Sequence, residues 1–244
     1  MSAARAIPAP LQADRAAALG LTHVSRETLA RLDVFVEVLL LWQSKTNLIS
    51  PTTIPRLWTR HIADSLQLLD LAPKAKVWVD LGSGGGFPGI PIACALRHTA
   101  KASTAEYGGI GGRLDHAPNE DADSAAALVH LVESNAKKAA FLREAVRATH
   151  APAQVHAMRI EKFVDSFQGR PDAVTARALA PLKTLLDQCV TIIQAGAVGL
   201  FPKGQDVEAE LTLAAKYWNI NHTLVPSRTD PRGQIVVVRA LERR

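Results

Sequence analysis

The stretch VWVDLGSGGGFPGIP, residues 77–91, decides the fold of this chain. Its first five residues are mostly apolar, which predicts a buried strand over 77–81 with Asp80 near its end. Four of the next five residues are glycines, so the strand runs straight into a glycine loop. Because glycine has no Cβ, such a loop turns tightly and lets a nucleoside lie against the backbone. The stretch therefore predicts a nucleotide-binding turn between a strand and a helix.

Around this turn, short apolar runs alternate with helical segments. We expect strands over residues 77–81, 128–132, 154–158, 173–176, 198–201, 222–225 and 235–239, with helices over 89–96 and about 135–147. This alternation predicts an α/β fold with a Rossmann-like, mostly parallel sheet. The final connection, through residues 230–233, is too short for a crossover helix, so the last strand is expected to be antiparallel. That ending is typical of class I methyltransferase sheets and unusual for dehydrogenases.

The sequence also predicts a helical region before the sheet and an insertion within it. Residues 1–72 are predicted to be a helical N-terminal region, with about ten disordered residues at its start, Ser25 as an N-cap and a turn over 47–55. Residues 73–244 form the predicted sheet domain. Residues 99–127 are rich in Ala, Gly and Asp and lack periodicity, so we expect an insertion loop there.

Composition and charge limit which classes of protein this chain can belong to. The net charge of +5 and the pI near 9.4 favour polyanionic partners only weakly. The two cysteines, Cys94 and Cys189, leave no room for a disulfide framework or a CxxC metal site. No apolar run approaches the roughly 20 residues of a membrane-spanning helix. We expect a cytoplasmic protein without a metal.

The position of the acidic residue that accompanies the glycine loop indicates which kind of nucleotide the loop binds. A phosphate-binding P-loop is excluded because no Gly-Lys-Ser/Thr follows. Gly84, Gly86 and Gly89 satisfy GxGxxG, but the acid that a dinucleotide site needs about 20 positions later is absent, and Glu106 lies in the insertion. Glu133 ends the next apolar strand, where its carboxylate can accept from both hydroxyls of a ribose.

Seven blocks of residues, several outside the glycine loop, follow in a characteristic order. They are Trp42 with Asn47-Leu48, Arg60-His61-Ile62 with Asp64-Ser65, the loop 80–91, residues 133–142 (ESNAKKAAFL), Arg159-Ile160-Glu161, Ala176-Arg177-Ala178 and Lys203-Gly204. On these blocks the chain resembles the RsmG family (glucose-inhibited division protein B), the guanine-N7 methyltransferases of small-subunit ribosomal RNA. The resemblance covers about residues 25–240, apart from the insertion.

The resemblance implies a cofactor, a substrate and a set of site residues. The cofactor would be S-adenosyl-L-methionine, and the acceptor N7 of guanine 527 in 16S ribosomal RNA, either naked or in the small ribosomal subunit. The residues implied to bind the cofactor are Gly82, Gly84, Gly86, Phe87, Glu133, Ile160, Glu161 and Arg177. Those implied to face the RNA are Asn47, Arg60, His61 and Lys203. A monomer is expected. Phe87 stands where the family commonly has a smaller aliphatic residue.

The implied chemistry needs no general base. Guanine N7 carries an in-plane lone pair and no proton, so catalysis would rest on alignment, with Arg177 as a positioning residue. Two alternatives stay open at this point. A nicotinamide-dependent oxidoreductase would bind NAD rather than S-adenosylhomocysteine, and a non-catalytic RNA-binding assembly protein would transfer no methyl group. A protein or small-molecule methyl acceptor is a further alternative.

Overall fold

The computed structural model describes residues 9–96 and 126–244 of the chain. Most of the expected N-terminal tail and of the insertion over 99–127, including Glu106, therefore lies outside the described residues. Residues 9 and 10, expected to be part of the tail, open the first helix instead. No helix in the described ranges is both long and apolar enough to cross a membrane.

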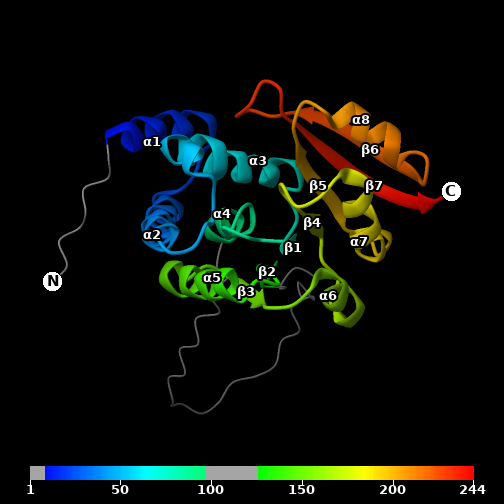
Figure 1. Ribbon diagram of the computed structural model, residues 1–244, viewed down its shortest axis with the longest axis horizontal. Coiled ribbons are helices and arrows are strands. Elements are labelled where there is room, and N and C mark those ends of the chain that lie inside the picture. The colour runs from blue at the N-terminus through cyan, green and yellow to red at the C-terminus, as the bar shows by residue number, and fades with distance from the viewer. Residues whose placement is uncertain (1–8, 97–125) are drawn as a thin grey trace, which may run out of the picture.

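The described N-terminal region is helical, as the sequence predicts (Figure 1). It contains α1 (Ala9–Leu21), α2 (Arg26–Gln43), the 3-10 helix η1 (Pro51–Arg56), the π-helix η2 (Trp58–Ala63) and α3 (Asp64–Leu71). Ser25 caps α2, because its hydroxyl accepts from the backbone N–H of Thr28 at 3.1 Å. The single π turn of η2 carries Arg60 and His61. Such turns are frequent at functional sites.

The remaining described residues build an α/β unit on a seven-stranded sheet. Its elements are β1 (Val77–Leu81), α4 (Gly89–Ala95), β2 (Leu128–Val132), α5 (Ala136–Thr149), β3 (Ala153–His156), α6 (Ile160–Ser166), β4 (Ala173–Thr175), α7 (Leu182–Gln194), β5 (Val198–Lys203), α8 (Val207–Ala214), β6 (Trp218–Pro226) and β7 (Gln234–Arg243). The strand order is β3-β2-β1-β4-β5-β7-β6. Strands β1 to β5 pair in parallel, whereas β7 is antiparallel to both β5 and β6. The predicted fold class, including the antiparallel last strand, is confirmed.

Alternate side chains of the strands point into two different cores. Trp78 of β1 belongs to a core cluster that includes residues of α2, α3, α4 and α5, and Val79 belongs to another that includes residues of α6, α7 and α8. The N-terminal helices therefore share the first core with the sheet. The division of the chain at residues 72 and 73 into two domains stays a prediction.

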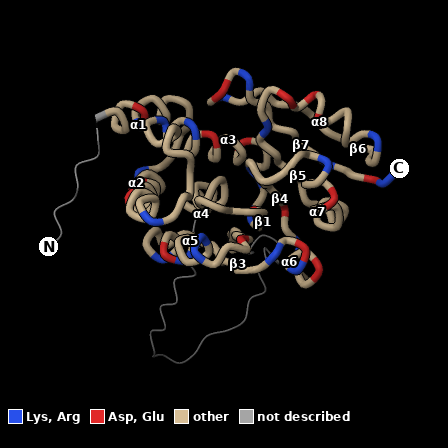
Figure 2. Tube along the Cα trace, viewed as in Figure 1, with Lys and Arg blue, Asp and Glu red and all other residues tan. Residues whose placement is uncertain are grey.

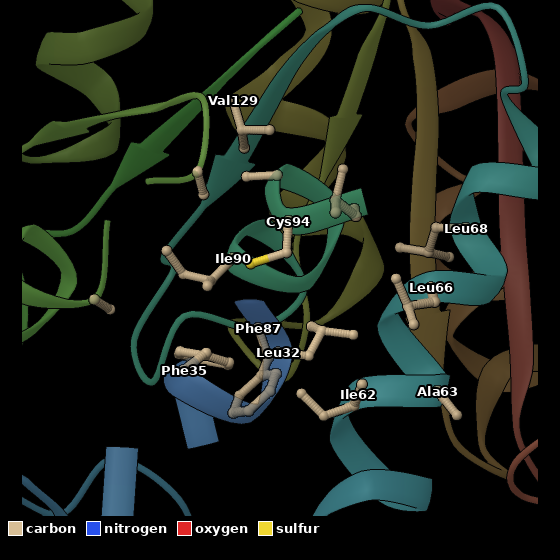
Figure 3. Close-up of a cluster of buried hydrophobic side chains, with 14 of the residues drawn as sticks. Leu32, Phe35, Ile62, Ala63, Leu66, Leu68, Phe87, Ile90, Cys94 and Val129 are labelled. Carbon is tan, nitrogen blue, oxygen red and sulfur yellow. The ribbon is translucent and has the colours of Figure 1, made fainter. Parts of the chain in front are cut away.

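Phe35 of α2 lies where the helical region meets the glycine loop (Figure 3). Its ring is fully buried, 5.2 Å from the Phe87 ring and 6.3 Å from the Phe141 ring, measured between centroids. Phe87 belongs to the glycine loop and Phe141 to α5. One aromatic side chain thus joins the N-terminal region to two elements of the sheet unit.

Several of the expected boundaries are wrong, among them that of β3, which ends at His156 and not at residue 158. The segment 47–55 is not entirely a turn, because η1 begins at Pro51. Strands β6 and β7 are longer than the expected 222–225 and 235–239. Strand β6 forms an edge of the sheet with mostly exposed or half-buried side chains, so its polar residues hide the apolar pattern of a strand.

We expect Phe35→Ala to lower the free energy of unfolding by about 3–5 kcal/mol, the usual cost of removing a buried aromatic ring. Since the ring contacts both regions, unfolding should remain a single transition. Urea unfolding followed by far-UV circular dichroism and by tryptophan fluorescence tests this. Two separate transitions, only one of them shifted by the substitution, would contradict the shared core.

Candidate functional site

A buried carboxylate near the end of β1 connects this strand to the helix that follows the glycine loop. Asp80 is fully buried, and its Oδ2 accepts from the backbone N–H of Gly89 at 3.1 Å. Its Oδ1 has no partner among the described residues. Burial, the largest cause, raises the pKa of this carboxyl to about 7. Asp80 thus anchors the first turn of α4 beneath the glycine loop.

Glu133, directly after β2, contacts the glycine loop, as the sequence predicts. Its Oε2 accepts from the backbone N–H of Gly84 at 3.0 Å, and its Oε1 accepts from that of Asn135 at 2.7 Å. Gly84 has a φ of 52°, a conformation that favours glycine. Each carboxylate oxygen has a further lone pair, so the group can still accept two hydroxyl donors.

A cleft of about 540 Å³ opens between these elements. We call it the glycine-loop cleft. Its lining includes seven of the eight predicted cofactor residues, namely Gly82, Gly84, Phe87, Glu133, Ile160, Glu161 and Arg177. Gly86 does not line it. Gly86 is buried, and a Cβ there would meet Ile90 and Phe35, so this glycine permits close packing under the loop.

One wall of the glycine-loop cleft comes from the helical region. Leu48 and Ile49 line the cleft, and a Cβ on Gly85 would lie 2.8 Å from the carbonyl oxygen of Leu48. Gln43 fixes this wall, because its Oε1 accepts from the backbone N–H groups of Leu48 and Ile49 at 3.0 and 3.1 Å. Its Nε2 donates to the Ile49 carbonyl at 2.8 Å.

A second cleft, of about 580 Å³, adjoins the first. We call it the adjacent cleft. Segments from η2, the loop after β4, the end of β5, α8 and the β6–β7 connection line it. The residues that line both clefts are His61, Arg177, Ala178 and Leu179. These four residues form the junction between the two clefts.

Arg177 ties this junction to the helical region. Its NH1 donates to the Arg60 carbonyl at 3.0 Å and to Asp64 Oδ2 at 3.2 Å, and its NH2 donates to His61 Nδ1. The guanidinium carbon also lies 5.2 Å from the centroid of the Phe87 ring. The side chain is 16% exposed, so it reaches the cleft with only part of its surface.

Asp64 is the buried counter-charge of Arg177. Its Oδ1 accepts from Thr229 Oγ1 at 2.6 Å and from Gln67 Nε2 at 2.9 Å. Thr229 belongs to the β6–β7 connection. One carboxylate therefore joins α3, the loop after β4 and the β6–β7 connection.

His61 is neutral in this setting. Because Nδ1 accepts from Arg177, Nε2 carries the proton and donates to Thr53 Oγ1 at 2.8 Å. Burial, followed by the positive charges of Arg177 and Arg60, lowers the pKa of His61 to about 3.

The residues predicted to face RNA are not all available to it. Arg60 is 44% exposed and pairs with Asp230 at 2.7 Å across the adjacent cleft. His61 is buried, and Lys203 is 9% exposed and paired with Glu210. Asn47 is exposed beside the Leu48 wall and lines neither cleft. The RNA contacts of all four residues stay predictions.

Sequence reasoning missed several residues of the site. Leu179 lies at the junction and in contact with Gly82, where a Cβ would come within 2.6 Å of its side chain. Asp64 and Gln43 act through part-buried hydrogen bonds, and Ile49 forms part of the wall. Leu and Gln side chains carry no chemical signal in a sequence. The described residues contain no group of three potential metal ligands.

Comparison with known proteins finds one matching family model and relatives that cover nearly the whole chain. The family model described as rRNA small subunit methyltransferase G matches residues 28–102 and 122–236. A ribosomal RNA small subunit methyltransferase G of Nitrobacter hamburgensis is 54% identical over 245 residues, covering 100% of this chain and 85% of the relative. Its counterpart in Bradyrhizobium sp. (strain BTAi1) is 54% identical over 233 residues, with 96% and 94% covered.

Solved structures agree on the fold. The O-methyltransferase from Bacillus cereus, in complex with SAH, superimposes with a TM-score of 0.55 at 13% identity. The match covers 93% of this chain and 96% of that one.

We expect His61→Gln to change how stability depends on pH. In the native state His61 stays neutral down to a pKa of about 3, whereas in the unfolded chain it takes up a proton near its ordinary value of 6.5. Wild-type stability from this group is therefore complete above pH 6.5 and declines as the pH falls from 6.5 toward 3, by up to about 1.4 kcal/mol per unit.

Glutamine can make the same two hydrogen bonds but does not titrate. The stability advantage of the wild type over the variant should shrink steadily below pH 6.5 in urea unfolding measurements. An advantage that stays constant from pH 7.5 to about pH 4.5 would show that His61 is not held neutral.

Proposed function

Because the chain belongs to the rRNA small subunit methyltransferase G family, it is an S-adenosylmethionine-dependent methyltransferase of 16S ribosomal RNA, and we propose that it methylates N7 of an unpaired guanine. By the family resemblance, that nucleotide is guanine 527. Membership of this family sets aside the nicotinamide-dependent alternative. The observation that supports the proposal most is the junction, where a nucleoside-sized cleft and a second cleft share Arg177 and Leu179.

The glycine-loop cleft fits the cofactor. Glu133 presents a carboxylate with unused lone pairs beside the glycine loop, which suits the two hydroxyl donors of a ribose. Val132, Met158 and Ile160 supply apolar surface next to it for an adenine ring. The volume of about 540 Å³ lies within the usual range for small-ligand sites.

Glu161 has a different role from Glu133. It lies in the first turn of α6 and is exposed at the rim of the cleft, where its Oε1 accepts from Gln188 Nε2 at 3.4 Å. This contact is long, so the carboxylate can also face a ligand. We assign Ile160 and Glu161 to the adenine end of the cleft and Phe87 to the opposite end.

The adjacent cleft would receive the target base. RNA-binding proteins read unpaired bases by stacking and by hydrogen bonds to the base edges. The adjacent cleft offers both kinds of surface, with Leu179 and Pro181 beside Arg60 and Asp230. A base inserted there would meet the cofactor at the junction.

S-adenosylmethionine supplies an electrophilic methyl group on a sulfonium, and guanine N7 attacks it without first losing a proton. The protein therefore has to align the two reactants and exclude water, and orientation can supply about 7–11 kcal/mol of the barrier reduction. Leu179 provides apolar surface at the junction, and Phe87 provides apolar surface beside Arg177 in the glycine-loop cleft. No described side chain is assigned as a general base.

Arg177 acts as a positioning residue. Its guanidinium is balanced by Asp64, so the junction can accept a cationic sulfonium beside it without an uncompensated like charge. Its two hydrogen bonds to η2 place it against Phe87. Arginine suits this role because its planar group donates in several directions at once.

Net charge alone does not locate the RNA surface. Lys and Arg are spread over most elements and interspersed with Asp and Glu (Figure 2). Lys138 and Arg159, however, lie on the rim of the glycine-loop cleft, where they can meet phosphates near the bound nucleotide. We further propose that the protein acts as a monomer in the cytoplasm, where its two cysteines, both buried and free, stay reduced.

Methyl transfer to RNA from cells that lack this protein tests the proposed function. Purified chain and labelled S-adenosylmethionine should label 16S ribosomal RNA in the small subunit, and borohydride with aniline should cleave it at one N7-methylated guanine. Label in protein, on another base atom or absent altogether would contradict the proposal.

We expect Arg177→Lys to lower kcat at least about tenfold, equivalent to about 1.4 kcal/mol of transition-state alignment. Lysine keeps the charge opposite Asp64 but cannot donate to Arg60, Asp64 and His61 together. Arg177→Ala should also reduce turnover, with a larger stability loss because Asp64 stays buried without its partner.

The matched control is Arg147→Lys, on an exposed arginine paired with Glu144 on α5. Its activity should match the wild type. Loss of activity in Arg177→Lys that merely parallels a drop in Tm would remove the positioning role.

A further inference from the structure

The loop between β4 and α7 forms the wall shared by the two clefts. Arg177, Ala178 and Leu179 line both of them, and Ala180 and Pro181 continue along the adjacent cleft. Ala178 has a φ of 52°, in the left-handed region that residues with a Cβ rarely adopt. Such a conformation persists only when the surrounding contacts impose it.

The Lys203–Glu210 ion pair contacts the backbone of this loop just after Ala178. Lys203 Nζ, at the end of β5, donates to the Ala180 carbonyl at 2.8 Å and to Glu210 Oε2 at 2.7 Å. The same Glu210 oxygen accepts from the backbone N–H of Leu182, the first residue of α7. Two backbone groups on either side of Pro181 are therefore held by one ion pair.

We call the Lys203–Glu210 pair, with its hydrogen bonds to the backbone of Ala180 and Leu182, the clamp. Leu179 is the residue directly before Ala180. Its side chain lies against Gly82 of the glycine loop and between the two clefts. Leu179 is 37% exposed although it is a large apolar residue, so it presents apolar surface where the reactants meet. A shift of Ala180 would displace this side chain relative to Arg177, which is held separately by Asp64 and His61.

Lys203 is poorly placed to bind RNA directly. Its side chain is 9% exposed, and its ammonium already donates to two protein oxygens. A lysine that binds phosphate needs an ammonium group that is exposed and is not already neutralised by a carboxylate. In this respect Lys203 differs from Arg60, which lines the same cleft but is 44% exposed.

We propose that Lys203 and Glu210 are positioning residues for methyl transfer, which hold the loop 177–181 so that Leu179 and Arg177 align the target base with the cofactor. This role rests on the proposed function of the two clefts. It acts through the loop and not through contact with RNA.

Lys203→Met should lower kcat about ten- to hundredfold, because a displacement of about 1 Å at a reacting centre has effects of that size. The Kd for S-adenosylhomocysteine and the slope of log Kd for RNA against log salt should change little. Amide hydrogen exchange of residues 178–182 should become faster. Since the two residues form one unit, Lys203→Met with Glu210→Gln should be no worse than Lys203→Met alone.

Two further variants keep the test informative. Lys203→Arg should recover part of kcat, because a guanidinium can donate to both oxygens. Lys216→Met removes the same charge from an exposed residue after α8 and should leave kcat and exchange unchanged.

Three results would overturn the proposal. The first is an unchanged kcat in Lys203→Met with a salt slope smaller by about 0.7–0.9, the mark of one lost phosphate contact. The second is full recovery of kcat at a temperature where the variant is as folded as the wild type. The third is unchanged amide exchange in the loop. If the wild-type chain methylates no RNA, the proposed function is wrong. The amide exchange measurement would still show whether Lys203 and Glu210 hold the loop.

Discussion

The buried pairing of Asp64 with Arg177 is the interaction on which the shape of the site depends. The two residues are 113 positions apart, in the first turn of α3 and in the loop after β4. Removing one partner of such a pair leaves the other charged and buried, which is strongly unfavourable. The pair therefore fixes the helical region onto the carboxyl edge of the sheet. The hydrogen bonds from Gln67 and Thr229 to Asp64 extend the same constraint to the β6–β7 connection.

Around this pairing, each cleft is assembled from segments far apart in the sequence. The glycine loop and Glu133 come from neighbouring parallel strands, whereas Leu48, Ile49 and His61 come from the helical region. The helical region is consequently part of the wall of the glycine-loop cleft. Its π turn brings the Arg60 carbonyl and His61 against Arg177, so cofactor and base would be aligned by contacts across both parts of the chain.

The sequence allowed the sheet to be predicted because buried parallel strands are short apolar runs, and the place of Glu133 followed from its position at a strand end. Tertiary contacts explain what could not be predicted. Gly86 satisfies a nucleotide-binding pattern, yet it packs under the loop against Phe35. Nothing in the sequence indicates that Lys203 pairs with Glu210, because the charge of a lysine alone does not show which carboxylate lies beside it. No periodicity reveals which loop residue, such as Leu179, will lie between two clefts.

A crystal structure of the chain with S-adenosylhomocysteine tests the central claim most directly. The adenosine should lie in the glycine-loop cleft with its ribose hydroxyls on the Glu133 carboxylate, its base beside Ile160 and its sulfur facing Arg177 and Leu179. A ligand bound elsewhere, or a Glu133 side chain turned away from the ribose, would contradict this account of the site.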